Sequence, residues 1–206
     1  MDEPRQFPTP KRLLLRMHQD LAKIVVPFDG FNRADLTDIE TIIILLEDRR
    51  FFQHPGIDLK SILREFLRMC TLQKHGGAST IDMQFVRTKT GYKAKTAKRK
   101  LYEMLLAYLL QFRMSKLAIL RSYLDVVYLG SGLYGIDSAA YKMFGKSVWE
   151  VETKEAAFIA AMMVYPRPLR PTAIWKQKVD RRAQYGLRLF RRYGSRYKQR
   201  FEEEPS

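Results

Sequence analysis

The sequence predicts a mostly α-helical domain, and three observations lead to that expectation. Apolar residues recur at helical spacing in several segments, strand-like alternation is scarce, and no internal repeat is visible. With 206 residues, 46% of them apolar and 12% aromatic, the chain can bury one sizeable core, in one domain or in one domain with two lobes. This composition excludes the disordered and low-complexity classes of protein.

Two helices are expected in the first quarter of the chain. Residues 11–26 carry apolar side chains at helical spacing and are followed by a proline, which ends the helix. Residues 36–52 are predicted as the second helix, because Thr37 is a suitable N-cap and Glu40 stands at the capping-box spacing. Glu47 then falls near the C-terminal end of that helix.

A basic amphipathic helix is predicted at residues 59–70. Its apolar residues keep helical spacing, while Lys60, Arg64 and Arg68 recur every four residues on another face. Two interpretations remain open at this point. The segment is either an ordinary surface helix with a solvated basic stripe or a helix that lies on a membrane surface.

The later segments also favour helices. Residues 75–80 form a glycine-containing loop that ends in two hydroxyl residues able to cap the next helix, and residues 115–129 read as a helix. Residues 130–146 mix glycines with aromatics, which indicates close packing and special backbone angles. Residues 155–164 are apolar all round and are expected to form a buried helix.

The charge of the chain indicates a polyanionic partner. Lys and Arg number 37 against 22 Asp and Glu, a net charge of +15, with seven basic residues and no acid at 87–100. Residues 167–200 hold twelve basic residues and one acid. Nucleic acid, an anionic membrane surface and phosphorylated substrates all fit such a charge, so it does not choose among them.

Several classes of site and segment are excluded. Cys70 is the only cysteine, so neither an intrachain disulfide nor a cysteine-based metal site is possible. The three scattered histidines make no metal-ligand pattern, and no metal site is predicted. The longest apolar run, residues 156–165, is too short to cross a bilayer, and no signal peptide is recognisable, so any contact with a membrane is expected at its surface.

Two carboxylates are candidates for chemistry. Glu47 directly follows the apolar run 42–46, where partial burial favours proton acceptance near neutral pH, although two nearby arginines oppose this effect. Glu103 lies four residues after Arg99 and three after Lys100, so cations share its helix face. The ordinary alternatives are a carboxylate at a helix end for Glu47 and a simple ion pair for Glu103.

Five segments, taken in order, resemble the motifs of the peptidoglycan glycosyltransferase family, which is the transglycosylase domain of bifunctional penicillin-binding proteins and of monofunctional transglycosylases. The segments are EDRRFFQHPGID at 47–58, GASTIDMQFVR at 77–87, KRKLYE at 98–103, KLAILRSYLDVVYLGSGLYGIDSAAYKMFGK at 116–146 and ETKEAAFIAAMMVYPRP at 152–168. Together they span about residues 40 to 170.

This resemblance implies a fold and a reaction. The fold is mostly α, with a lysozyme-like head lobe and a smaller jaw lobe that contacts the membrane, roughly residues 57–100. The reaction is polymerisation of lipid II into β-1,4-linked glycan strands with inversion and release of undecaprenyl diphosphate. The implied domain division is an N-terminal arm and helix at 1–35, the glycosyltransferase domain at 36–175, and a basic C-terminal helix and tail at 176–206.

The resemblance also implies roles for residues. Glu47 matches the catalytic base, which takes the proton of the acceptor 4-hydroxyl, and Glu103 matches a second essential glutamate. The substrate-binding candidates that match are Asp48, His54, Ser79, Thr80, Gln84, Arg87, Lys95, Arg99 and Lys100.

Cofactors and partners follow from the same resemblance. No cofactor is required, although a divalent cation, Mg or Mn, could stimulate the reaction at the diphosphate. The expected partners are lipid II, the growing glycan chain and an anionic membrane surface, with other cell-wall synthesis proteins as further candidates and no nucleic acid. The expected location is the outer, periplasmic face of the cytoplasmic membrane.

Some residues depart from the family pattern. The alternative hypothesis is therefore a catalytically weak homologue that binds lipid-linked precursor or a cell-wall complex. A third hypothesis, which rests on the basic charge, is a nucleic-acid-binding protein. Arg87 stands for the usual Lys and Lys95 for the usual Arg, which are not interchangeable on a phosphate. The other departures are Met83 for a common Gln, Gln111 for Glu, Arg121 for Glu and Asp125 for Asn.

Overall fold

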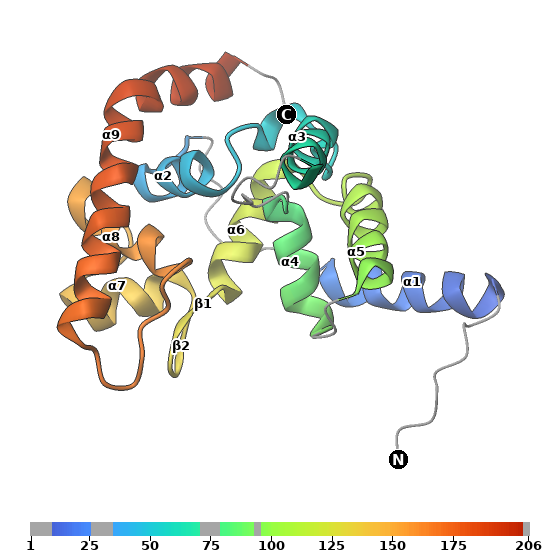
Figure 1. The fold of residues 1–206 in the computed structure, drawn as a ribbon, viewed down its shortest axis with the longest axis horizontal. Helices are drawn as coiled ribbons and strands as arrows, with labels where there is room; N and C mark the ends of the chain where they lie inside the picture. Colours follow the sequence, from blue (N-terminus) through green and yellow to red (C-terminus); the bar gives the residue numbers. More distant parts are fainter. Residues whose placement is uncertain (1–9, 26–34, 71–78, 93–95, 204–206) are drawn as a thin grey trace.

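The computed structural model describes residues 10–25, 35–70, 79–92 and 96–203, and the chain is mostly helical there, as predicted (Figure 1). Its helices are α1 Pro10–Ile24, α2 Asp38–Glu47, a 3₁₀ helix Phe51–Gln53, α3 Leu59–Cys70, α4 Ile81–Thr90, α5 Ala97–Leu110, α6 Lys116–Val126, α7 Ile136–Phe144, α8 Thr153–Met162 and α9 Ala173–Glu203. Two short strands, β1 Tyr128–Gly130 and β2 Leu133–Tyr134, form an antiparallel hairpin.

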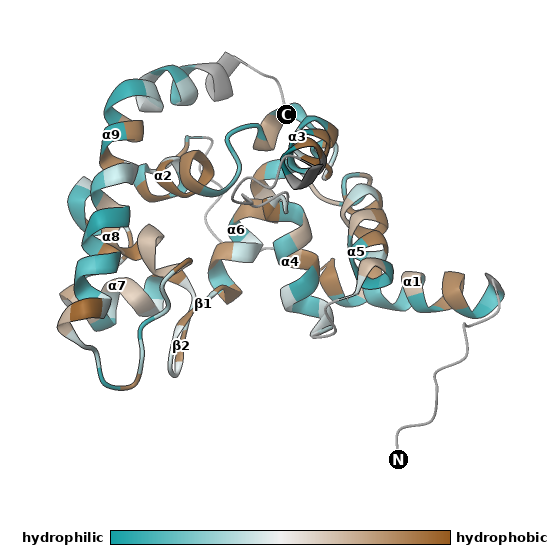
Figure 2. Ribbon diagram, in the orientation of Figure 1, coloured by the Kyte–Doolittle hydropathy of each residue, from teal (hydrophilic) through white to brown (hydrophobic). Residues whose placement is uncertain are grey.

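Helix α2 contributes to the part of the core that it shares with α8 and α9. It packs against α8 and α9, which run along one end of the molecule in Figure 1, while α4 packs against α6, α5 and α1. Figure 2 shows α2 as largely hydrophobic and α9 as largely hydrophilic. Burial accounts for this difference, because Ile42, Ile43 and Ile44 are fully buried in the core that α9 covers on one side.

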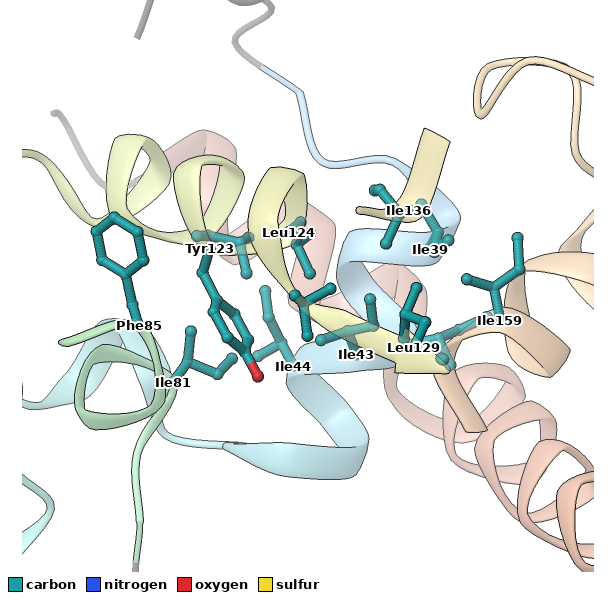
Figure 3. Packing of buried hydrophobic residues seen from close by; sticks show 14 of the residues in the cluster. Ile39, Ile43, Ile44, Ile81, Phe85, Tyr123, Leu124, Leu129, Ile136 and Ile159 are labelled. Carbon is teal, nitrogen blue, oxygen red and sulfur yellow. The ribbon is translucent and has the colours of Figure 1, made fainter. Parts of the chain in front are cut away.

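Figure 3 shows part of the core between α2, α4 and α6. Ile44 of α2 lies near Tyr123 of α6 and Ile81 of α4, and all three belong to one core cluster. Residues 155–164, predicted as a buried helix, form most of α8, and its alanines and Ile159 are fully buried. One continuous hydrophobic core therefore fixes the ends of α2, α4 and α6 relative to one another.

The predicted start of α2 is confirmed and its predicted end is wrong. The Thr37 side chain accepts from the backbone N–H of Glu40, and the Glu40 carboxylate accepts from the N–H of Thr37, as expected of a capping box. The helix ends at Glu47 rather than at residue 52, because Asp48 leaves the helical conformation with φ −153° and ψ 77°. That turn directs the Asp48 carboxylate toward α4 instead of continuing the helix.

The glycine-rich segment 130–146 adopts the special backbone angles that were predicted. Gly130 has φ +151°, and a Cβ on it would lie 2.4 Å from the carbonyl oxygen of Arg167, so only glycine fits beside that strand. The helix predicted to reach residue 129 ends at Val126, because the chain turns extended at Val127 to enter the hairpin. The predicted domain boundaries, including the jaw lobe, remain predictions.

Candidate active site

Glu47 occupies the last position of α2, at the edge of the buried core. Its side chain is 15% exposed, and Oε1 accepts a hydrogen bond from Nη2 of Arg182 on α9 at 3.0 Å. The same Nη2 donates to the carbonyl of Leu46 at 3.2 Å. Glu47 therefore follows a buried apolar run, residues 42–46, at the end of its helix, as the sequence suggested. Arg182 was not among the predicted site residues.

Glu103 is fully buried on α5 and is held by two arginines. Nη1 of Arg99, one helical turn earlier, lies 2.9 Å from Oε1. Arg87 of α4 donates from Nε to Oε1 at 3.3 Å and from Nη2 to Oε2 at 3.4 Å. Nη2 of Arg87 also contacts the hydroxyl of Ser79 at 3.5 Å. Four predicted site residues, from the second and third motif segments, thus form one cluster, which carries two positive charges and one negative charge.

Tyr123 contacts a predicted substrate-binding residue, and it too was absent from the residues predicted from the sequence. Its hydroxyl donates to Oε1 of Gln84, a predicted substrate-binding residue on α4, at 2.8 Å. Burial raises the pKa of Tyr123, and the charge of Glu47 raises it further while that of Arg87 lowers it. Both charges therefore act on the same phenol, whose hydroxyl points past Ile44 in Figure 3. The only sequence signal was its place in the fourth motif.

Asp48 and His54 join a buried polar network under the site. Nε2 of His54 lies 3.1 and 3.2 Å from the two Asp48 oxygens, and the backbone N–H of Ile81 donates to Asp48 Oδ2 at 3.1 Å. Next to them, Nζ of Lys116 lies 2.9 Å from both oxygens of Asp82. This network connects the end of α2 with the start of α4, and the structure gives Asp48 and His54 structural partners; their predicted substrate-binding role remains a prediction.

The burial of this network shifts its titrations. Burial raises the pKa of Asp82, against the opposing effect of the Lys116 charge. Burial likewise lowers the pKa of Lys116, an effect that Asp82 and Asp48 oppose. Asp48, His54 and Asp82 offer ligand atoms within 4.8 Å of one another, the spacing of a metal site. Since Lys116 already neutralises Asp82, this donor set suits an internal ion pair better than a divalent cation.

The remaining predicted binding residues lie around this framework. Thr80 is the N-cap of α4, as its position in the sequence suggested: its hydroxyl accepts from the N–H of Met83 and donates to the carbonyl of Gly56 at 2.7 Å. Lys100 is half-buried on α5, one residue after Arg99. Lys95 lies outside the described residues.

A cavity of about 160 Å³ lies at the N-terminal end of α2, away from Glu47. Its walls include Glu40, Arg121 and Asp125, so two residues that depart from the family's fourth motif meet there. Arg121 is buried and its Nε lies 2.7 Å from Oε1 of Glu40.

None of the described helices combines the length and the apolarity that crossing a bilayer requires. Apolar side chains nevertheless reach the surface on two helices near the candidate site. They are Leu59, Leu63 and Leu67 on α3, Leu101, Leu105 and Tyr108 on α5, and Phe112 just after α5. All of them are at least 41% exposed.

Comparison with known proteins finds relatives among penicillin-binding proteins and transglycosylases. Penicillin-binding protein 1A of Clostridium tetani is 36% identical over 149 residues, which cover 70% of this chain and 19% of that protein. The protein named "Putative transglycosylase H16_A0665" of Cupriavidus necator is 37% identical over 131 residues, 64% of this chain and 57% of that protein. Penicillin-binding protein 1A of Aquifex aeolicus is 37% identical over 131 residues, 62% of this chain and 18% of that protein.

The chain spans about a fifth of the length of these penicillin-binding proteins and just over half of the Cupriavidus protein. The family model described as "Transglycosylase" matches residues 17–190, which include Glu47, Glu103 and every other residue of the candidate site. The chain therefore belongs to the transglycosylase family.

Proposed function

We propose that this chain is a peptidoglycan glycosyltransferase that polymerises lipid II into β-1,4-linked glycan and releases undecaprenyl diphosphate. The observation that carries the proposal is the presence of two charged groups, Glu47 with Arg182 and Glu103 with Arg87 and Arg99. On one side, Glu47 leaves a buried helix with a partly exposed carboxylate. On the other side, Arg87 and Arg99 converge on the fully buried Glu103. This arrangement fits a base for the acceptor sugar and cations for the diphosphate of the donor.

Glu47 would act as the general base. Its Oε2 would accept the proton of the acceptor's 4-hydroxyl as that oxygen attacks the anomeric carbon of the donor, with inversion at that carbon. General base catalysis of this kind is typically worth about 10² to 10⁴ in rate. Its Oε1 lies 3.0 Å from Nη2 of Arg182, so a cation stands beside the proposed base.

The leaving diphosphate needs cations rather than an acid. The bond from the anomeric carbon to the diphosphate oxygen breaks, and the electron pair stays on the diphosphate, which Arg87, Arg99 and Lys100 would stabilise. The half-exposed guanidinium of Arg87, 39% exposed, is the best placed to reach a ligand. Glu103 would keep both arginines in position, since it contacts them from a fully buried site. A divalent cation could add to this stabilisation without being required.

The exposed leucines of α3 support membrane contact by this part of the chain. Leu59, Leu63 and Leu67 share one face with a spacing of four residues, and they are 56% to 70% exposed. Such a face beside the basic residues of the same helix is typical of a helix at a membrane surface. A lipid-anchored substrate would be reached from there, on the outer face of the cytoplasmic membrane.

Incubation with labelled lipid II tests the proposal. The wild-type chain should form glycan polymer, and Glu47→Gln should reduce its rate by at least about 10²-fold, the lower end of general base catalysis. Glu150→Gln, which changes an exposed glutamate outside the five motifs and keeps an oxygen that can accept from the N–H of Ser147, is the matched control and should leave the rate unchanged. Polymer formation undiminished in Glu47→Gln would refute the assigned base. Tight binding of lipid II without any product would favour the catalytically weak homologue.

A further inference from the structure

Arg182, in the first third of α9, contacts Glu47 from a part of the chain that none of the five motifs includes. We propose that Arg182 is a positioning residue for the reaction: it holds Oε1 of Glu47 so that Oε2 is the oxygen presented to the acceptor hydroxyl. This inference rests on the proposed function, because it assigns Arg182 a task only if Glu47 is the base.

The position of Glu47 creates the need for such a partner. Glu47 is the last residue of α2, and a helix C-terminus carries partial negative charge from its unpaired carbonyl groups, which disfavours a carboxylate there. Nη2 of Arg182 donates to the Leu46 carbonyl at 3.2 Å and to Oε1 of Glu47 at 3.0 Å. One guanidinium nitrogen thus neutralises the helix end and the carboxylate together.

The two oxygens of Glu47 consequently differ. Oε1 is held by Arg182, whereas Oε2 accepts no hydrogen bond from any other described residue. The charge of Glu47 raises the pKa of Tyr123, whose hydroxyl donates to Oε1 of Gln84 at 2.8 Å. A base with one oxygen fixed and the other open loses fewer orientations when the acceptor binds.

The backbone of α9 packs closely against α2 around Arg182, which holds the contact between Arg182 and Glu47 in place. Gly186, one helical turn after Arg182, faces α2 so closely that a Cβ on it would lie 3.1 Å from Leu46 and 3.2 Å from Ile42. Val179 and Ala183 of α9 are buried in the core. The helix that carries Arg182 therefore packs against the same two turns of α2 that carry Glu47.

Neighbouring arginines provide a matched experiment. Arg182→Gln removes the cation, Arg182→Lys keeps a charge but offers an ammonium instead of a guanidinium fork, and Arg181→Gln removes the same charge from an exposed position. For Arg182→Gln we expect kcat on lipid II to fall about 10- to 100-fold, the cost of a misplaced catalytic group, with KM within about threefold of wild type. Arg182→Lys should recover part of the loss, and Arg181→Gln should match wild type.

Each outcome decides the question. An unchanged kcat in Arg182→Gln, with an active wild type, overturns the inference and leaves the proposed function standing. A raised KM with unchanged kcat overturns it as well, because Arg182 would then bind substrate rather than orient the base. A wild-type chain that makes no polymer refutes the proposed function and this role with it. If Arg182→Gln fails to fold, the same two criteria are applied to Arg182→Met, which keeps the apolar part of the side chain.

Discussion

Replacing Glu103 by glutamine should destabilise the folded chain, because it leaves two arginines facing each other without their shared anion. Glu103 is fully buried and makes contacts of 2.9, 3.3 and 3.4 Å to Arg99 and Arg87. Removing one partner of a buried pair costs about 3 to 5 kcal/mol. Since Arg87 is 39% and Arg99 17% exposed, solvent screens part of the loss, and about 2 to 3 kcal/mol is the expected cost.

Thermal unfolding measures this cost directly. For a chain of this size each kcal/mol lowers Tm by about 2 to 4 °C, so Glu103→Gln should unfold about 4 to 12 °C below wild type. The control is Asp125→Asn, an exposed acid on α6, which should change stability by less than about 0.5 kcal/mol. A Tm for Glu103→Gln within about 1 °C of wild type would refute the reasoning. In that case the loss of polymer in this variant would be purely catalytic.

Three further predictions follow from other contacts. Burial acts to raise the pKa of Asp58, but hydrogen bonds from Ser61 and the charge of Arg50 prevail and lower it. Ionised Asp58 thus stabilises the fold above its unfolded pKa, and this stabilisation is lost as the pH falls through the lower, folded pKa. In urea titrations, Asp58→Ala should have a lower free energy of unfolding than wild type at pH 7, and the difference should narrow below about pH 4. Leu63→Glu should weaken sedimentation with anionic vesicles several-fold, and unchanged binding would remove α3 from the membrane surface. A chelator should reduce, but not abolish, polymer formation, and complete loss would contradict the proposal that cationic side chains suffice.

Local signals in the sequence predicted the helix starts well. Thr37 and Thr80 both cap the helices that follow them, because capping depends only on residues within one turn. The end of α2 was mispredicted because its cause is remote: Asp48 turns away to bond the N–H of Ile81, 33 residues later. The residues around Asp48 in the sequence give no indication of that hydrogen bond.

The candidate site shows the same division. The pair of Arg99 and Glu103 follows from a spacing of four residues on one helix, and the structure confirms it. Arg182 reaches Glu47 from 135 residues away, and Tyr123 reaches Gln84 from 39 residues away. Such contacts depend on how α9 and α6 pack, which a single sequence does not specify.

Two departures from the family pattern, Gln111 and Arg121, are compensated by their neighbours in this structure. Gln111 stands where the motif often has Glu, and its amide donates to the buried Asp82 at 2.9 Å. A glutamate there would place a second carboxylate beside Asp82, with Lys116 as the shared cation, whereas the neutral amide satisfies Asp82 without added charge.

Arg121 follows the same logic on another helix. A buried arginine requires an anion, and Glu40 supplies one at 2.7 Å while still closing the capping box of α2. The charge of Arg121 is thus paired with Glu40 at the N-terminal end of α2, whereas Glu47 lies at the other end of that helix. Because both substitutions are satisfied within the framework rather than at the two glutamates, they are compatible with an unchanged catalytic arrangement. Arg87, which contacts Glu103 itself, is the departure on which donor preference should depend.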